Sequence, residues 1–100
     1  MSAYVIVDIT VTDPARYEEY KQMAPEAVAL YGGRYLARGG AVETIEGDWA
    51  PTRLVILEFE SVERAKAWWN SPEYRDAKQI RHEAARSKMI VVEGASPVIG

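Results

Sequence analysis

The sequence predicts a single α+β domain with the element order β-α-β-β-α-β and an antiparallel four-stranded sheet. Two stretches rich in β-branched residues, Tyr4–Val11 and Arg53–Phe59, are each followed by a capping residue and a helical pattern. The two halves echo each other, because I-V-D-I-T at 6–10 and I-L-E-F-E at 56–60 share one pattern fifty residues apart. The glycine-rich stretch Tyr31–Pro51 joins them. Two β-α-β halves of this kind are typical of a ferredoxin-like fold.

The first half contains one strand and one long helix. Valine and isoleucine alternate with other residues over Tyr4–Val11, which favours a strand with one apolar face. Asp13 stands before a proline at a position suited to capping a helix, and apolar residues then recur at helical spacing over 14–31. Pro25 lies inside this helix and is expected to kink or restart it. Gly32 is expected to end it in the left-handed conformation.

The glycine-rich stretch predicts an irregular second strand. We expect a short strand at Arg34–Arg38, a kink or bulge at the glycine pair 39–40 and a second strand piece at Val42–Glu46, since a regular strand would not tolerate so much glycine. Residues 48–52 form a turn in this interpretation, and Arg53–Phe59 is the third strand.

The second half is expected to hold a divided helix and a last strand. Ser61 can cap the first helical part, and the Asn-Ser-Pro sequence at 70–72 breaks the pattern and starts a further helical segment. Lys88–Glu93 is the predicted final strand. The domain is therefore expected to cover residues 1–94, with 95–100 as a C-terminal tail.

One face of the predicted sheet has no cover. The first and third strands would lie side by side in its centre, and both helical regions would cover the same face. A domain of 100 residues buries too little surface to leave an apolar face in water, so we expect a homodimer. Alternation places four apolar side chains on the uncovered face, and they are Tyr4, Ile6, Leu54 and Ile56.

Composition and charge argue against several classes of function. The net charge is -3 with acids and bases mixed along the chain, so no basic patch predicts nucleic-acid binding. No apolar run approaches the roughly 20 residues that span a bilayer, and the N-terminus shows neither a lipidation signal nor a signal peptide. We therefore expect no membrane partner and a cytoplasmic location.

The sequence also lacks the usual signals for cofactors. There are no cysteines, which excludes disulfides, thiolate metal sites and cysteine nucleophiles. There is one histidine and no spaced ligand set, so no metal site is expected. The glycine-rich stretch has neither the spacing of a dinucleotide fingerprint nor a following helix. No cofactor is predicted.

Two carboxylates are the first candidates for catalysis. If Val7 and Ile9 face the helices, Asp8 faces the open side. Glu58 occupies the equivalent position in the repeated pattern of the second half, so it is expected on the same side. Two carboxylates on neighbouring central strands in an apolar interior would raise the pKa of at least one of them through desolvation and repulsion, as in general acids and bases. The alternative is structural, with each carboxylate paired with an arginine or solvated near a strand end.

Three arginines and a tryptophan are the candidates for ligand binding. Arg34 and Arg38 are expected on one face of the second strand, and Arg53 begins the neighbouring strand. Their guanidinium groups suit an anionic or carbonyl-bearing ligand. Trp49 either covers a pocket or anchors a partner chain. The alternative is a solvated strand edge, or ion pairs between two subunits.

His82 is the only histidine and the last candidate for catalysis. Its neighbours are Arg81 and Glu83, so a solvated side chain is one interpretation. A proton shuttle is the other, because the ordinary pKa of histidine lies near neutrality.

Five motifs resemble those of a known family. They are YVIVDITVTDP at 4–14, YGGRYLARGG at 31–40, EGDW at 46–49, RLVILEF at 53–59 and WNSPEY at 69–74. Over nearly its whole length the chain resembles a family of small bacterial proteins known as a domain of unknown function, within the dimeric α/β-barrel superfamily. The resemblance implies a ferredoxin-like protomer and two sheets that face each other across a two-fold axis to enclose a barrel.

The resemblance implies no particular activity. More distant members of the superfamily include cofactor-free quinone-forming monooxygenases, isomerases, haem-degrading enzymes and stress-response barrels, but their catalytic residues do not map onto this chain by motif. Three hypotheses therefore stay open. They are a cofactor-free enzyme acting on a small anionic or aromatic organic molecule, a non-catalytic or stress-related module that binds such a ligand, and a purely structural dimer.

Overall fold

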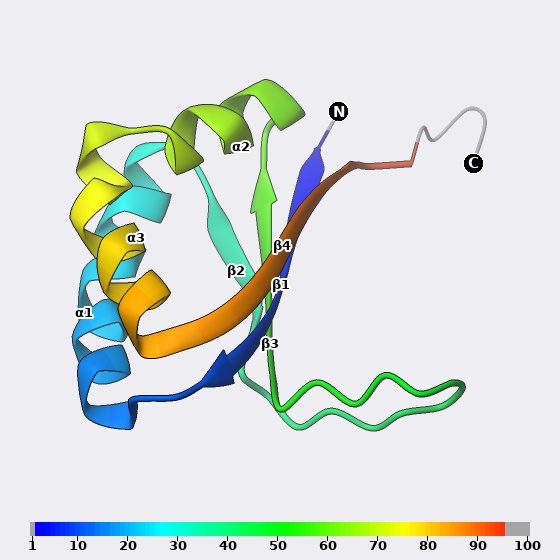
Figure 1. The fold of residues 1–100 in the computed structure, drawn as a ribbon. Coiled ribbons are helices and arrows are strands. Elements are labelled where there is room, and N and C mark those ends of the chain that lie inside the picture. Colours follow the sequence, from blue (N-terminus) through cyan, green and yellow to red (C-terminus); the bar gives the residue numbers. More distant parts are fainter. Residues whose placement is uncertain (1, 96–100) are drawn as a thin grey trace.

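The computed structural model describes residues 2–95, which form a four-stranded sheet and three helices (Figure 1). The order β-α-β-β-α-α-β confirms the α+β prediction and the division of the second helical region. The division of the chain into a domain over 1–94 and a tail over 95–100 stays a prediction, because residues 96–100 lie outside the described part. The elements are β1 (Ala3–Val11), α1 (Pro14–Leu30), β2 (Arg34–Arg38), β3 (Arg53–Phe59), α2 (Val62–Trp69), α3 (Pro72–Ala84) and β4 (Ala85–Glu93).

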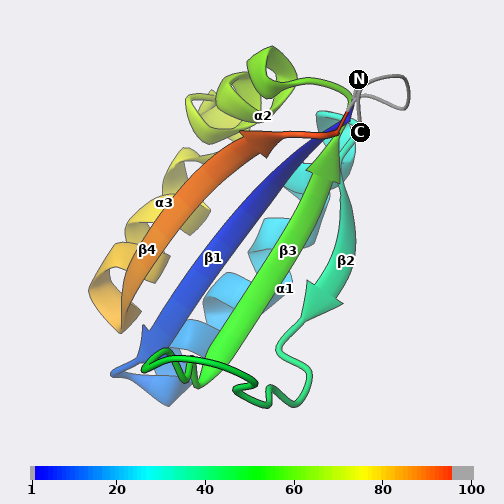
Figure 2. The ribbon, with the colours of Figure 1, turned by 90° about the vertical axis from the view of Figure 1, so that its right-hand side faces the viewer.

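The four strands form one antiparallel sheet in the order β2-β3-β1-β4, so β1 and β3 occupy the centre (Figure 2). Ile6 of β1 stands opposite Ile56 of β3 on one side and opposite Ile90 of β4 on the other. All three helices lie against the same face, as Figure 1 shows. This is the predicted ferredoxin-like arrangement. β4 begins at Ala85 instead of Lys88, because an edge strand tolerates polar residues that resemble a loop in the sequence.

The ends of α1 follow their sequence signals. The Asp13 side chain accepts a hydrogen bond from the Arg16 backbone N–H at 3.1 Å, which satisfies one open donor of the first turn. At the other end Gly32 has a φ of 75°, and its N–H donates to the carbonyl oxygen of Ala29. Both the N-terminal cap and the left-handed glycine are as predicted.

Pro25 does not interrupt α1, which runs as one helix over Pro14–Leu30, so the expected restart is wrong. A proline has no N–H and leaves the carbonyl oxygen four residues earlier without its helical donor. That oxygen belongs to Lys21, and it accepts a hydrogen bond from the Arg38 side chain of β2 at 2.7 Å. The neighbouring strand thus supplies the donor that the helix lacks.

The second strand piece expected at Val42–Glu46 is absent, and residues 39–52 form an exposed loop instead. A strand needs a neighbour to satisfy its backbone groups, and β3 begins only at Arg53, so this segment has no strand to pair with. Figures 1 and 2 show the loop extending from the sheet on the side opposite the helices.

Side chains alternate between the two faces of the sheet. Val5, Val7 and Ile9 of β1 are buried beneath the helices, where Trp68 and Tyr74 complete the core. We call the uncovered side the open face. It is apolar at its centre, where its side chains are Tyr4, Ile6, Leu54, Ile56, Ile90 and Val92.

Candidate functional site

Asp8 and Glu58 both lie on the open face, as alternation predicts, but they do not form a pair. Asp8 stands opposite Leu54, and Glu58 stands opposite Tyr4. The two carboxylates are therefore four positions apart along the sheet, or roughly 13 Å. An antiparallel register places equivalent positions of the two halves toward opposite ends of the strands, so the expected repulsion between these carboxylates is wrong.

Each carboxylate has a partner of its own. Arg34 Nη2 lies 2.6 Å from Glu58 Oε1, and Arg34 Nε donates to the same oxygen. This hydrogen bond holds the pKa of the Glu58 carboxyl below its ordinary value, opposite to the direction expected for a desolvated acid. At the other end, the indole N–H of Trp49 donates to Asp8 Oδ2 at 2.8 Å and fastens the 39–52 loop to the open face.

A β-bulge at Leu36 separates the two arginines of β2. The register with β3 shifts by one residue there. Arg34 stands opposite Glu58 on the open face, whereas Arg38 stands opposite Val55, whose side chain is buried under the helices. The expectation that Arg34 and Arg38 share a face is therefore wrong, because one extra residue turns the following side chain over.

Arg38 and Arg53 are brought together on the helix face, beside α1. Arg53 Nε donates to the Tyr17 hydroxyl at 3.1 Å, and the guanidinium lies over the Tyr17 ring. Arg38 donates to the Lys21 carbonyl oxygen, and its Cζ lies 4.6 Å from the centroid of the Tyr35 ring. Two of the three predicted arginines therefore lie close together, without Arg34.

A buried polar cluster lies between α1 and α3. The hydroxyl oxygens of Tyr20 and Tyr74 are 2.7 Å apart, and Arg81, which is 3% exposed, donates to Tyr74 and to Ser87. Burial raises the pKa of the Tyr20 phenol well above its ordinary value, so this hydroxyl stays protonated. Arg81 is not among the predicted site residues, although it follows Tyr74 by seven residues, two helical turns along the inner stripe of α3.

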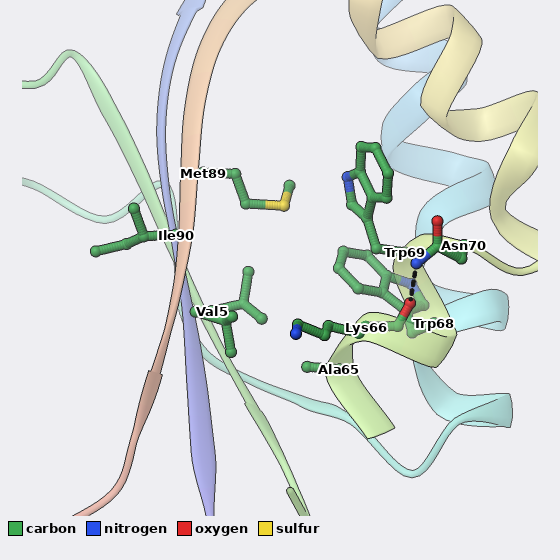
Figure 3. Close-up of a pocket in the computed structure, with 9 residues that line it drawn as sticks. Val5, Ala65, Lys66, Trp68, Trp69, Asn70, Met89 and Ile90 are labelled. Atoms are coloured by element: carbon green, nitrogen blue, oxygen red, sulfur yellow. Dashed lines mark hydrogen bonds between the residues drawn. The ribbon is translucent and has the colours of Figure 1, made fainter. Parts of the chain in front are cut away.

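An apolar slot lies between α2 and β4 (Figure 3). Its volume is about 240 Å³, and seven of its nine lining residues are apolar, with Lys66 and Asn70 as the polar ones. The indoles of Trp68 and Trp69 stand on one side, and Met89 reaches toward them from β4. Tryptophans at helical spacing look like core residues in a sequence, which is why the slot was not predicted.

A cationic cavity of about 450 Å³ adjoins the slot and shares Trp69 and Met89 with it. Its polar lining includes Arg81, His82 and Arg86. Partial burial, and then the charges of Arg81 and Lys78, lower the pKa of His82 below its ordinary value. The imidazole is therefore neutral near pH 7.

Two kinds of feature are not found within residues 2–95. No three acidic or histidine side chains lie close enough together to hold a metal ion. No helix in this part of the chain has the length and apolar character needed to cross a membrane.

The family model described as a domain of unknown function (DUF1330) matches residues 2–95 of the chain. The chain belongs to the DUF1330 family. The resemblance indicated by the sequence is thereby confirmed at the level of the family. None of the curated proteins matches the chain.

Solved structures share the fold of this DUF1330 chain at low sequence identity. A protein of unknown function from Rhodopseudomonas palustris has a TM-score of 0.76 and 19% identity, covering 96% of this chain and 84% of that chain. A dimeric ferredoxin-like protein of unknown function from Jannaschia sp. CCS1 has a TM-score of 0.70 and 13% identity, covering 94% and 100%. SnoaB, a cofactor-independent oxygenase from Streptomyces nogalater, has a TM-score of 0.65 and 10% identity, covering 97% and 96%. Identities this low establish the fold alone.

Proposed function

We propose that this DUF1330 protein binds a small, flat organic acid, with its ring in the slot and its acid group toward Arg81 and Arg86. The observation that carries the proposal is the slot itself, in which two indoles and a methionine border about 240 Å³ beside a cationic cavity. An apolar cavity of roughly 150 Å³ already admits a benzene-sized molecule. The slot therefore suits a single aromatic ring.

One wall of the slot carries an unsatisfied donor, the indole N–H of Trp68. Its indole N–H is buried and has no hydrogen-bond partner within residues 2–95. A buried donor without an acceptor costs about 1–3 kcal/mol. The Trp68 ring lines the slot, but its N–H is enclosed, so a ligand oxygen reaches this donor only after a shift of the neighbouring side chains.

Arg81 supplies the reason for an anionic group. Its side-chain hydrogen-bond partners are the hydroxyls of Tyr74 and Ser87 rather than a carboxylate. A buried cation without a counter-ion is costly, and an anion in the adjoining cavity would offset part of that cost. Arg86 lines the same cavity and adds a second positive charge.

If the protein is an enzyme, His82 is the proposed general base. Its neutral imidazole lines the cationic cavity and can accept a proton from a ligand whose acid group is held by Arg81. SnoaB, which shares the fold, is a cofactor-independent oxygenase, and this supports chemistry without a cofactor on such a scaffold. In the non-catalytic form the protein uses the same slot and releases the ligand unchanged.

We also propose that a second copy of the chain covers the open face. The isoleucines at 56, 6 and 90 form a row across it, and Ile90 is 61% exposed. Apolar surface of this kind is rarely left in water, and the Jannaschia neighbour is dimeric. Asp8 and Glu58 would be enclosed in such a dimer. Their catalytic role stays a prediction, and an interface role is the alternative.

Calorimetric titration with benzoate tests the slot in the whole protein. We expect saturable binding by the wild type and a loss of about tenfold or more in affinity in Trp69→Leu, because the substitution removes one wall of the slot. Trp49→Leu is the matched control, since Trp49 is also exposed but lies in the 39–52 loop. Equal affinity in the wild type and Trp69→Leu would contradict the slot.

A second measurement separates an enzyme from a binder. Benzoate and its hydroxylated analogues are incubated with the protein in D₂O and recovered for mass spectrometry. Deuterium uptake or a changed mass that disappears in His82→Gln identifies catalysis through His82. Recovery of unchanged ligands that nevertheless bind assigns the non-catalytic form.

A further inference from the structure

We propose a second ligand site, in which Arg38, Arg53 and Lys21 bind a phosphate group beside α1. The site faces a cavity of about 390 Å³ lined by these three residues together with Glu18 and Gln22. It shares no lining residue with the slot, so it is independent of the function proposed above.

Two features of the backbone place Arg38. The bulge at Leu36 turns this side chain from the open face to the helix face. Pro25 then leaves the Lys21 carbonyl oxygen without a helical donor, and Arg38 Nη2 donates to it at 2.7 Å. The guanidinium is thereby fixed on the backbone of α1 and keeps its remaining N–H groups for a ligand.

A third feature, Gly39, makes room for Arg53. The φ of Gly39 is 75°, which favours glycine, and a Cβ at this position would lie 2.9 Å from the Arg53 Cζ and overlap the guanidinium. The Tyr17 hydroxyl, 3.1 Å from Nε, holds Arg53 from another side. Both Nη groups of Arg53 are therefore left to bind a ligand.

The site carries an excess of positive charge. Its one acid, Glu18, lies 2.8 Å from Lys21 Nζ. Within residues 2–95, no carboxylate lies within 4.0 Å of the guanidinium of Arg38 or Arg53. Arginines held by a carbonyl, a hydroxyl and aromatic rings keep their charge available for an anion.

A phosphate group fits this arrangement better than a carboxylate. A carboxylate is planar and fills one guanidinium fork, whereas a phosphate presents three terminal oxygens and up to two charges. Two guanidinium groups and an ammonium, from β2, β3 and α1, match these three oxygens in number. A free phosphate ion and the phosphate group of a small organic molecule share this chemistry.

NMR titration with inorganic phosphate at constant ionic strength tests the site through the arginine Nε–H signals. We expect the signals of Arg38 and Arg53 to shift saturably with phosphate and to stay in place with sodium chloride. Arg38→Ala and Arg53→Ala should each weaken binding about tenfold or more. Arg75→Ala, which removes an exposed charge from α3, is the matched control and should leave binding unchanged. An equal loss of phosphate affinity in Arg75→Ala and Arg38→Ala would show that phosphate is attracted only by the overall charge of the protein. That result would overturn the site.

A parallel titration with phenyl phosphate distinguishes the two sources of the phosphate group. Tighter binding of phenyl phosphate than of inorganic phosphate indicates a phosphorylated organic molecule, and equal binding indicates the free ion. Absence of saturable binding by both probes would refute the site.

Two variants that keep every charge make the test specific. Pro25→Ala returns to α1 an N–H that competes for the Lys21 oxygen, and Gly39→Ala pushes the Arg53 guanidinium aside. Both should weaken phosphate binding several-fold. Pro25→Ala decides the question even where Gly39→Ala does not fold, because alanine is favoured in a helix. A folded Pro25→Ala protein with wild-type phosphate affinity would show that the positioning of Arg38 is not used for binding.

Discussion

The two faces of the sheet are built from the same strands and differ in how completely they are covered. On the helix face, Trp68 and Tyr74 stack with ring centroids 4.3 Å apart, and the Tyr74 hydroxyl is hydrogen-bonded to Tyr20. On the open face, isoleucines of the central row are only partly buried or largely exposed. The helix face is thus complete within one protomer, whereas the open face is covered only by the second copy that we propose. Both proposed ligand sites lie on the helix face.

The largest difference between the faces should appear in stability. Trp68→Ala should lower the free energy of unfolding by about 3–5 kcal/mol, because it removes a fully buried indole from the core. Trp49→Ala should cost far less, since Trp49 is 58% exposed. Urea denaturation of both variants measures the contrast. Equal losses would show that the open face with its loop is packed as tightly as the core.

The next effect concerns the oligomeric state. Ile90→Asp places a charge in the centre of the open face and should convert the proposed dimer to a monomer, as measured by light scattering after size exclusion. Leu30→Asp is the control, because Leu30 is similarly exposed but lies at the end of α1. A monomeric wild type at micromolar concentration would contradict the proposal for the open face.

A smaller effect tests the polar cluster of the helix face. Tyr20→Phe removes the hydrogen bond to the buried Tyr74 hydroxyl and should cost about 1 kcal/mol in the free energy of unfolding. Tyr31→Phe should cost less, because the Tyr31 hydroxyl donates to Glu73 at the surface. A larger loss in the free energy of unfolding for Tyr31→Phe than for Tyr20→Phe would contradict a stabilising role for the buried Tyr20–Tyr74 hydrogen bond.

The smallest effect is a pH dependence from His82. Its pKa is lowered in the folded protein, so below the ordinary value near 6.5 the unfolded chain binds more protons than the folded one. Stability should therefore fall as the pH drops from about 7.5 to 5.5, and His82→Gln should remove this part of the slope. An NMR titration that gives His82 a pKa above 6.5 would contradict the assigned direction.

Side-chain alternation alone predicted the faces of Asp8 and Glu58, because every residue of a regular strand changes face. The pairing of the two carboxylates failed because it also requires the register. With Ile6 opposite Ile56 in an antiparallel pair, Asp8 must stand opposite Leu54. The repeated pattern in the two halves does not predict this register. Fold and faces therefore follow from local pattern, whereas distances across the sheet do not.

Which residues meet in the two ligand sites is hard to predict from one sequence, because it depends on contacts between separate elements. One extra residue at Leu36 decides that Arg38 faces the helices, and nothing in R-Y-L-A-R marks which residue is extra. Pro25 is visible in the sequence and predicts a kink or restart, but the Arg38 side chain that serves the Lys21 oxygen in its place lies on another element and cannot be predicted. Arg81 lies on the inner stripe of α3, but its burial is not predictable from the sequence because arginines are seldom buried.

The central claim, that a small organic acid binds on the helix face beside β4, is tested most directly by the methyl signal of Met89. The chain has three methionines, and Met23 on α1 serves as an exposed internal control. In a titration with benzoate followed by methyl NMR, the Met89 signal should shift saturably while the Met23 signal stays in place. A Met89 signal that does not move, together with shifts of the Ile6 methyl groups, would place the ligand on the open face and contradict the claim.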